Sequence, residues 1–199
     1  MGKIKGKLSN DFCPQQLFLY GNYQEDGTPH FGLFCWFSYC SLEEEAGEWL
    51  GVMACIGEDK LTKDLIRRQG VFSANLVTRP LLPLADYYGT VSGRDPHKMD
   101  RLPTVEPGQV LHVPTIAESP VSFELQVVEE RHLAPGSDLF ICRVRNVLVE
   151  EDLAAEDQPF IQRLLRADPV ITAGDTRYAA LDGQDLGPWG EARADLPPL

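Results

Sequence analysis

The sequence predicts a mainly β protein, a small barrel of short strands with a few short helices beside it. Short apolar or alternating runs recur along the chain, turn signals such as Asp26-Gly27-Thr28-Pro29 separate them, and a helical period occurs only in brief stretches. Evenly spaced short strands between turns are typical of a β-barrel. For 199 residues we expect one domain over 1–199, with the barrel at about 11–153 and a C-terminal helix and extension at 154–199.

Six runs have the composition of strands. The first two flank the turn at Gly27 and predict a hairpin, and the third is continuously apolar, as a buried strand would be. An Ala134-Pro135-Gly136 turn separates the last two, and the acidic stretch 43–48 is interpreted as an exposed connector. The predicted strands are residues 17–20, 31–37, 49–56, 71–77, 120–128 and 138–149.

Three segments carry helical signals. The first runs from Thr62, a suitable N-cap, to Gly70, a common helix terminator, with basic residues near its end. A second short helix is expected at 84–88, closed by Gly89, and a third at 159–167, where the apolar residues share one face.

The remaining segments are predicted to be loops. Pro80 and Pro83 are expected to break the chain after the fourth strand. Residues 92–111 are polar and rich in Gly and Pro, and a loop of this length inside a compact domain is usually functional. Residues 195–199 are expected to be a frayed tail.

The composition limits the possible partners. The formal net charge is −12, from 18 basic and 30 acidic residues. This charge opposes non-specific binding to nucleic acid or to an anionic membrane surface, but it does not oppose an anionic small ligand in a local pocket. No stretch approaches the roughly 20 apolar residues of a membrane helix, and the basic first residues lead into no long apolar run. We expect a cytoplasmic protein with no nucleic-acid and no membrane partner.

Several chemical motifs are missing from the sequence. There is no GxGxxG after a strand, no P-loop and no GxSxG, which opposes a Rossmann site, a nucleotide triphosphatase and an α/β-hydrolase. The five cysteines form no CxxC pair, which opposes a zinc site and a disulfide framework and favours buried thiols. The four histidines show no HExxH or other short-spaced pair, so no metal site is predicted.

Two stretches suit a ligand, and each has a plainer interpretation. Lys60, Thr62 and Lys63 lie where a strand leads into a helix, and a helix start with Thr and Lys suits a phosphate. The same residues also suit an ordinary capped surface helix. Residues 34–40 combine aromatic with small polar side chains, which suits the wall of a ligand pocket and equally an aromatic barrel core.

The order of several short motifs resembles a known family, although no motif is specific alone. In chain order they are Gly27-Thr28-Pro29, Ser38, Lys60-x-Thr62, Gly70-x-Phe72-x-x-Asn75-Leu76, Gly89-x-x-Ser92-Gly93 with Lys98, Ile116-Ala117-Glu118-Ser119-Pro120, and Tyr178 with Leu181 and Gly187. Over roughly 17–187, this arrangement resembles the flavin reductase-like family of FMN-binding split barrels, which includes flavoredoxins. The chain has His30 and Leu65 where many members have Asn.

The resemblance implies a six-stranded Greek-key split barrel that forms a homodimer, with FMN held at the subunit interface. By position, Lys60 and Thr62 would bind the phosphate, and the loop from Ser92 to Lys98 would cap the flavin from its own or the partner subunit. Asn75 would support the site. The residues expected to hold the cofactor are Trp36, Phe37, Ser38, Ala54, Cys55, Lys60, Thr62, Asn75, Ser92 and Lys98.

The resemblance also implies an FMN-dependent oxidoreductase, either an NAD(P)H:flavin reductase or a flavoredoxin-like electron carrier. No catalytic side chain is assigned, because a bound flavin itself carries hydride and electrons. NAD(P)H is the expected co-substrate, within a small-molecule donor and acceptor pair. The alternative is a non-catalytic split-barrel protein that binds FMN or haem; of the histidines, only His30 lies near the proposed pocket.

Overall fold

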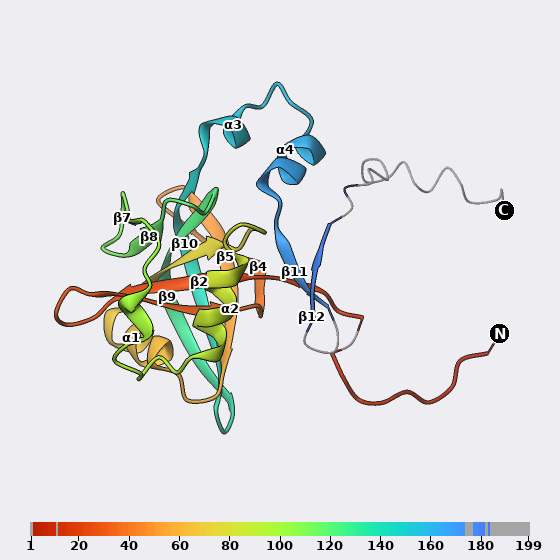
Figure 1. Cartoon of the computed structure of the whole chain (residues 1–199), viewed down its shortest axis with the longest axis horizontal. Helices are drawn as coiled ribbons and strands as arrows, with labels where there is room; N and C mark the ends of the chain where they lie inside the picture. Colours follow the sequence, from red (N-terminus) through yellow and green to blue (C-terminus); the bar gives the residue numbers. More distant parts are fainter. Residues whose placement is uncertain (1, 11, 174–176, 182, 184–199) are drawn as a thin grey trace.

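The chain forms a curved antiparallel sheet with helices packed beside it (Figure 1). The structure is a computed structural model that describes residues 2–10, 12–173, 177–181 and 183. Its largest sheet has seven strands in the order β3-β2-β6-β9-β10-β5-β4. These strands are β2 (Phe18–Tyr23), β3 (Pro29–Phe34), β4 (Phe37–Glu45), β5 (Glu48–Gly57), β6 (Val71–Leu76), β9 (Val121–Ala134) and β10 (Ser137–Val149).

The two edge strands of this sheet are neighbours in the chain, and this closes the barrel. Only Cys35 and Trp36 separate β3 from β4, so the sheet curves round until its first and last strands come together at this corner. The Cys55 N–H of β5 donates to the Trp36 carbonyl at 2.9 Å and fixes the corner. The mainly β fold is confirmed. The main sheet has seven strands and not the six predicted, because the run predicted at 31–37 breaks at this corner.

The other predicted strands are present, but the predicted acidic connector is wrong. β4 runs to Glu45 and β5 begins at Glu48, so residues 43–45 and 48 are in strands. Ala46 and Gly47 adopt φ values of 53° and 85°, as a two-residue type I′ hairpin turn requires. Charged side chains are compatible with β4 because it is an edge strand with exposed faces.

The helices lie outside the barrel. They are α1 (Leu61–Gln69), α2 (Leu82–Thr90), α3 (Glu151–Ala154) and α4 (Phe160–Ala167). The first and last predicted helices are confirmed. The second is longer than predicted: Pro83 is in its first turn, where a missing N–H removes no helical hydrogen bond, and Gly89 lies inside it. Among the described residues, no helix is both long and apolar enough to cross a membrane.

The segment predicted as a long loop, 92–111, is held against the barrel. It contains the short 3-10 helix η1 (Lys98–Asp100) and β7 (Val105–Pro107), which pairs with β8 (Pro114–Ile116). The buried carboxylate of Glu124 on β9 accepts hydrogen bonds of 2.5–2.9 Å from three consecutive backbone N–H groups, those of Gln109, Val110 and Leu111. The loop is therefore a fixed part of the domain.

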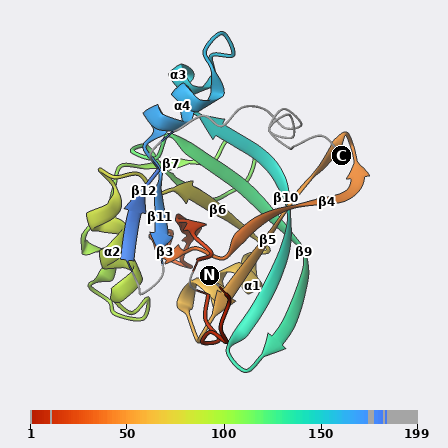
Figure 2. The ribbon, with the colours of Figure 1, turned by 90° about the vertical axis from the view of Figure 1, so that its right-hand side faces the viewer.

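A second, three-stranded sheet extends the structure on the side of α2. It joins β1 (Gln15–Gln16), β11 (Val170–Ala173) and β12 (Arg177–Ala180) in the order β1-β11-β12. Figure 2 shows the long, curved β9 and β10 on one side of the barrel and α2 with β11 and β12 on the other. Gly187 and the tail at 195–199 lie outside the described residues.

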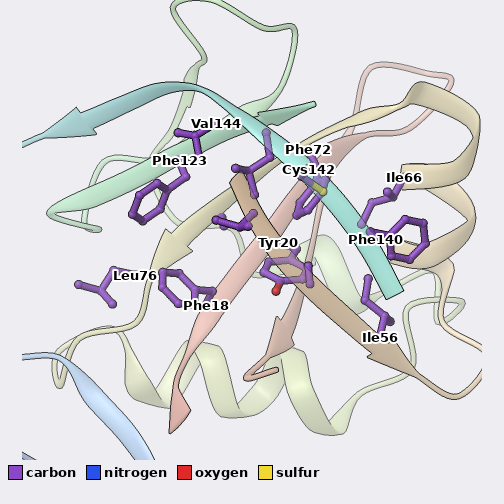
Figure 3. Close-up of a cluster of buried hydrophobic side chains, with 14 of the residues drawn as sticks. Phe18, Tyr20, Ile56, Ile66, Phe72, Leu76, Phe123, Phe140, Cys142 and Val144 are labelled. Atoms are coloured by element: carbon purple, nitrogen blue, oxygen red, sulfur yellow. The ribbon is translucent and has the colours of Figure 1, made fainter. Parts of the chain in front are cut away.

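Two apolar clusters hold the elements together. One fills the barrel, where Phe18 and Tyr20 from β2 meet Phe72 and Phe140 (Figure 3). The other lies between the outside of the barrel and α2, and it includes Leu19 from the same strand. Because neighbouring residues of a strand point to opposite faces, β2 is buried on both sides. Each fully buried large apolar side chain contributes roughly 1.5–3 kcal/mol, so α2 is firmly seated on β2 and β3.

Candidate functional site

A cavity of about 260 Å³ lies where β3, the start of α1 and the end of α2 meet. The loop that follows α2 closes one side of it. Four of the ten residues predicted to hold a cofactor line this cavity, although they come from distant parts of the sequence. The lining residues are Gly32, Leu33, Phe34, Asp59, Lys60, Leu61, Thr62, Tyr88, Gly89, Thr90, Val91, Ser92, Gly93, Arg94 and Lys98.

The start of α1 presents helical N–H groups at this cavity. Lys60 is the N-cap residue, with an extended backbone and no side-chain capping bond, and its Nζ pairs with Glu58 at 2.9 Å. Thr62 is not the N-cap that was predicted, because the helix begins one residue earlier, at Leu61. The first N–H groups of a helix lack the usual acceptor four residues back and attract anions; here the Lys63 N–H already donates to the Lys60 carbonyl at 3.0 Å, so the N–H groups of Leu61 and Thr62 are the candidates. The cavity therefore has one wall suited to negative charge.

Lys98 places a buried ammonium group in the same cavity. The residue is 3% exposed, its Nζ donates to the Tyr88 carbonyl at 2.8 Å, and it lies 5.7 Å from the centre of the Tyr88 ring. Within the described part of the chain, no carboxylate forms an ion pair with it. Burial, and then the charge of Lys60, lower the pKa of Lys98 to about 8. A buried cation with one neutral acceptor leaves donors available for an anion.

His30 and Thr62 form a hydrogen-bonded pair behind the cavity wall. His30 Nε2 lies 3.1 Å from Thr62 Oγ1, and both residues are buried. A Cβ atom added at Gly32 would lie 2.6 Å from the same hydroxyl oxygen, and one added at Gly93 would lie 3.0 Å from the imidazole. Burial, and then the charge of Lys98, lower the pKa of His30 to about 4. The imidazole is therefore neutral at physiological pH.

Arg94 fastens the loop after α2 to the start of α1. Its guanidinium donates to Asp59 at 2.9 Å and to Asp64 at 2.8 Å, and its backbone N–H donates to the Ser92 hydroxyl at 3.3 Å. Arg94 is paired with two carboxylates and the half-exposed Lys60 with one, Glu58, so Lys98 is the cation of this cavity that has no carboxylate partner among the described residues. Ser92 and Lys98 reach the cavity from the same chain as Lys60 and Thr62.

A second hollow of about 260 Å³ adjoins the first and shares Leu33, Phe34, Gly89 and Thr90 with it. It has more apolar walls and ends at β12. Its other lining residues are Leu17, Cys35, Thr172, Arg177 and Tyr178. Together, the two hollows fall within the range of roughly 300–1,000 Å³ that ligand pockets have. One end is therefore cationic and the other apolar.

Tyr178 holds β12 against α2 at the apolar end. Its hydroxyl donates to Asp86 Oδ1 at 2.7 Å. Burial, followed by the hydrogen bond to this carboxylate, raises the pKa of Tyr178 to about 12. The phenol therefore stays protonated and keeps this wall of the second hollow in place.

The other predicted cofactor residues do not line either hollow. Trp36 is 46% exposed at the corner between β3 and β4, and Ser38 is exposed on β4. The Phe37 ring packs 4.4 Å from that of Phe18, and Ala54 is wholly buried inside the barrel. The Cys55 Sγ lies 3.6 Å from Ser137 Oγ at the far end of β5. In a single subunit, these residues therefore lie at the corner between β3 and β4, on the edge strand β4, in the barrel core or at the end of β5.

Asn75 has a structural position in the barrel wall. Its amide N–H donates to the Leu19 carbonyl at 2.9 Å, and its Oδ1 accepts from Ile116 N–H at 3.1 Å and Ser122 Oγ at 2.7 Å. These bonds tie four strands together, namely β2, β6, β8 and β9.

Neither the cysteines nor the histidines gather into a metal site. All five cysteines are free, and only Cys142 is buried, so the interpretation as buried thiols holds for this residue alone. His97 bonds to Asp100 and His132 to Asp138, while the His112 ring stacks on Tyr23. In the described ranges, no group of three or more His, Cys, Asp or Glu residues could hold a metal ion.

The sequence analysis assigned no role to Thr90 or Arg94, which line the cavity. Phe34 and Cys35 belong to the run 34–40 that suited a pocket wall, and Tyr178 was named only as part of the family motif. The motif around Gly89 and Ser92 lies on the segment that lines the cavity. The motif could not show that Thr90, at the end of α2, lies beside β3.

Comparison with known proteins identifies the family of this chain. The family model for the flavin reductase like domain matches residues 13–168. The chain therefore belongs to this family, and the split-barrel fold and the family predicted from the motifs are both confirmed. Membership makes flavin-related oxidoreductase activity its class of function. No curated protein matches the sequence.

Solved structures show the same fold over nearly the full chain. The flavoredoxin of Desulfovibrio vulgaris (Miyazaki F) is 26% identical, with a TM-score of 0.77 over 95% of this chain and 99% of that one. The flavoredoxin from Methanosarcina acetivorans is 23% identical, with a TM-score of 0.81 over 97% and 98%. An FMN-binding protein from Thermus thermophilus, solved with bound p-hydroxybenzaldehyde, is 21% identical, with a TM-score of 0.71 over 94% and 99%.

Proposed function

We propose that the two adjoining hollows bind FMN, with its phosphate at the cationic end. The observation that carries this proposal is the buried ammonium of Lys98, which has no carboxylate partner among the described residues and shares a cavity with the start of α1. A phosphate carries about two negative charges at neutral pH and accepts several hydrogen bonds. It would be bound by Lys98, Lys60 and the N–H groups of the first turn of α1.

The flavin ring would occupy the apolar end. Leu33, Phe34 and Cys35 provide an apolar wall there, and Thr90 and Tyr178 provide polar groups at its edge. Such a combination orients a ring that is apolar on its faces and polar along one side. The sugar-like chain between ring and phosphate would pass Gly89, which lines both hollows.

In this site the protein would bind the flavin, orient its ring and shield it from water. The flavin itself supplies hydride and electron transfer when bound. We propose an FMN-dependent oxidoreductase that takes reducing equivalents from NAD(P)H, as a flavin reductase or as a flavoredoxin-like electron carrier. Family membership and the two flavoredoxin structures support this proposal. The low pKa of His30 and the high pKa of Tyr178 keep both side chains neutral near pH 7, and the group of these hollows whose pKa is lowered towards neutrality is Lys98, which the proposal assigns to the phosphate.

We also propose that the protein is a homodimer. Trp36, Tyr39 and Trp49 are 46%, 56% and 54% exposed around β4 and β5, and β4 is an edge strand. Exposed aromatic residues on a strand edge favour a protein partner. Trp36 and Ser38 would then lie at the interface, as the resemblance implies. Light scattering should give the mass of two chains, and Tyr39→Glu with Trp49→Glu should reduce it to one; a wild-type mass of one chain would contradict the dimer.

The flavin proposal is tested by comparing FMN with riboflavin, which lacks only the phosphate. Titration followed by flavin fluorescence should show tighter binding of FMN than of riboflavin by the wild type. The double variant Lys60→Ala/Thr62→Ala should lose much of that difference. Unchanged FMN affinity in the double variant would move the phosphate to another place.

A further inference from the structure

We infer that His30 is a positioning residue for phosphate binding: its neutral imidazole donates from Nε2–H to Thr62 Oγ1 and so leaves the Thr62 hydroxyl proton free for the anion. The inference rests on the proposed function and names a residue that touches no ligand itself. It starts from the 3.1 Å contact between Nε2 and Oγ1.

A hydroxyl group has a single proton, and its direction decides what Thr62 can do. If the imidazole nitrogen accepts, the proton of Thr62 is used on His30 and the hydroxyl offers only lone pairs to the cavity. If the imidazole nitrogen donates, the proton points elsewhere and can be given to an oxyanion. Thr62 lines the cavity, so the choice of imidazole tautomer determines whether this wall attracts or repels a phosphate.

The surroundings fix both the charge and the orientation of the imidazole. His30 is 1% exposed, and the one charged group that acts on it is Lys98, which opposes protonation. Within the described residues, no carboxylate pairs with it. The imidazole lies close to the loop after α2, since a Cβ atom at Gly93 would be 3.0 Å from His30 Cε1 and 3.3 Å from its Nε2. This close approach limits how far the ring can turn on the side of Gly93.

β3 itself brings His30 to this position. Residues 30 and 32 point to the same face of the strand because side chains alternate. Gly32 leaves room for the hydroxyl of Thr62 close to the strand, where a Cβ atom would lie 2.6 Å from it. The Thr62 hydroxyl thus sits in a niche formed by Gly32 and His30, and the bond to His30 is its one side-chain hydrogen bond in the described structure.

A double-mutant cycle tests the inference on the full chain, with FMN and riboflavin as the probes. Thr62→Val should weaken FMN binding about 10-fold, the loss of one hydrogen bond to a charged group. His30→Leu should weaken it by less, because the Thr62 hydroxyl keeps its proton and loses only the donor that orients it. The variant with both changes should be no weaker than Thr62→Val alone, because His30 acts through Thr62. His30→Gln, whose amide can donate, should stay within about threefold of wild type. Riboflavin affinity should change less than about twofold in all of them.

Three results would overturn the inference while leaving the flavin site in place. They are single-variant losses that multiply in the double variant, an equal loss of riboflavin and FMN, and a His30→Gln variant as weak as His30→Leu. A wild type that binds neither flavin would overturn the proposed function itself, and the inference with it.

A spectroscopic measurement covers the case in which His30→Leu does not fold. Nitrogen NMR of the wild-type FMN complex, with His30 assigned by comparison with His30→Gln, distinguishes a protonated ring nitrogen from an unprotonated one. We expect the proton on Nε2 and none on Nδ1. The opposite tautomer would overturn the inference.

Discussion

Replacing Lys98 by Met should separate phosphate binding from protein stability. The side chain keeps its length and apolar stem and loses the ammonium group, which donates to a single neutral acceptor, the Tyr88 carbonyl at 2.8 Å. In the wild type, the other N–H groups of the Lys98 ammonium can donate hydrogen bonds to the phosphate. A hydrogen bond to a charged group contributes about 1.5–3 kcal/mol, and about 1.4 kcal/mol is tenfold in affinity. Lys98→Met should therefore weaken FMN binding roughly 10- to 150-fold and leave riboflavin binding nearly unchanged.

The free protein should not be destabilised by the same change. Burial, and then Lys60, lower the pKa of Lys98 to about 8, below the value of about 10.4 in an unfolded chain. The charged form is thus disfavoured by folding at neutral pH, and this cost disappears as pH rises from about 8 towards 10. The melting temperature of the flavin-free variant should equal or exceed that of wild type.

The pH dependence of FMN binding gives a second readout. A bound phosphate should raise the pKa of Lys98 again, so binding takes up a proton above pH 8. Above about pH 7, where the phosphate is fully charged, FMN affinity in the wild type should be flat to about pH 8 and fall beyond it, and Lys98→Met should stay flat over the same range. Calorimetry at several pH values measures this, with Lys5→Met, an exposed and distant charge change, as the control. Equal losses for FMN and riboflavin, or unchanged FMN affinity, would refute the assignment of Lys98.

Three further changes test the framework around the site. Asp138→Asn leaves the buried Lys63 without its opposite charge and should lower the free energy of unfolding in urea by about 3–5 kcal/mol. Because the pKa of Asp138 is lowered to about 2, this stabilisation is full above about pH 4 in the wild type and is lost as pH falls through 2. The stability of the variant should therefore depend less on pH between about 4 and 2. Gly70→Ala, at a φ of 68°, should lower the urea midpoint by the equivalent of about 1 kcal/mol with an unchanged slope, and an unaltered midpoint would contradict the cap. Tyr178→Phe removes the bond to Asp86 and should cost about 1 kcal/mol while the secondary structure by circular dichroism stays the same.

Local signals predicted the strands and the start of the site well. The apolar run that became β5 and the alternation in β9 and β10 survive in the structure because each buries one face in the barrel. Gly70 ends α1 in the left-handed conformation, as glycine does at a helix C-terminus. Lys60 and Thr62 were placed at a helix start by spacing alone, and they do line the cavity.

Long-range packing decided what the sequence could not show. Pro83 and Gly89 suggested a broken, short helix, but α2 spans both because Ala85 and Tyr88 bury its inner face against the barrel. The run at 34–40 suited a pocket wall and equally a barrel core, and the resemblance assigned Trp36, Phe37 and Ser38 to the flavin. The corner at Trp36 divides this run: both Phe34 and Phe37 pack against the barrel core, and of the two Phe34 also lines the cavity. No local pattern records such a corner.

The most direct test of the account is an absorbance spectrum of the purified protein after incubation with FMN and desalting, repeated with riboflavin and followed by anaerobic NADH or NADPH. The account predicts that FMN stays with the protein and is bleached by the nicotinamide, and that riboflavin is lost on desalting because Lys98 has no phosphate to hold. A protein that retains neither flavin, or that retains riboflavin as well as FMN, would contradict a phosphate-anchored flavin site at α1.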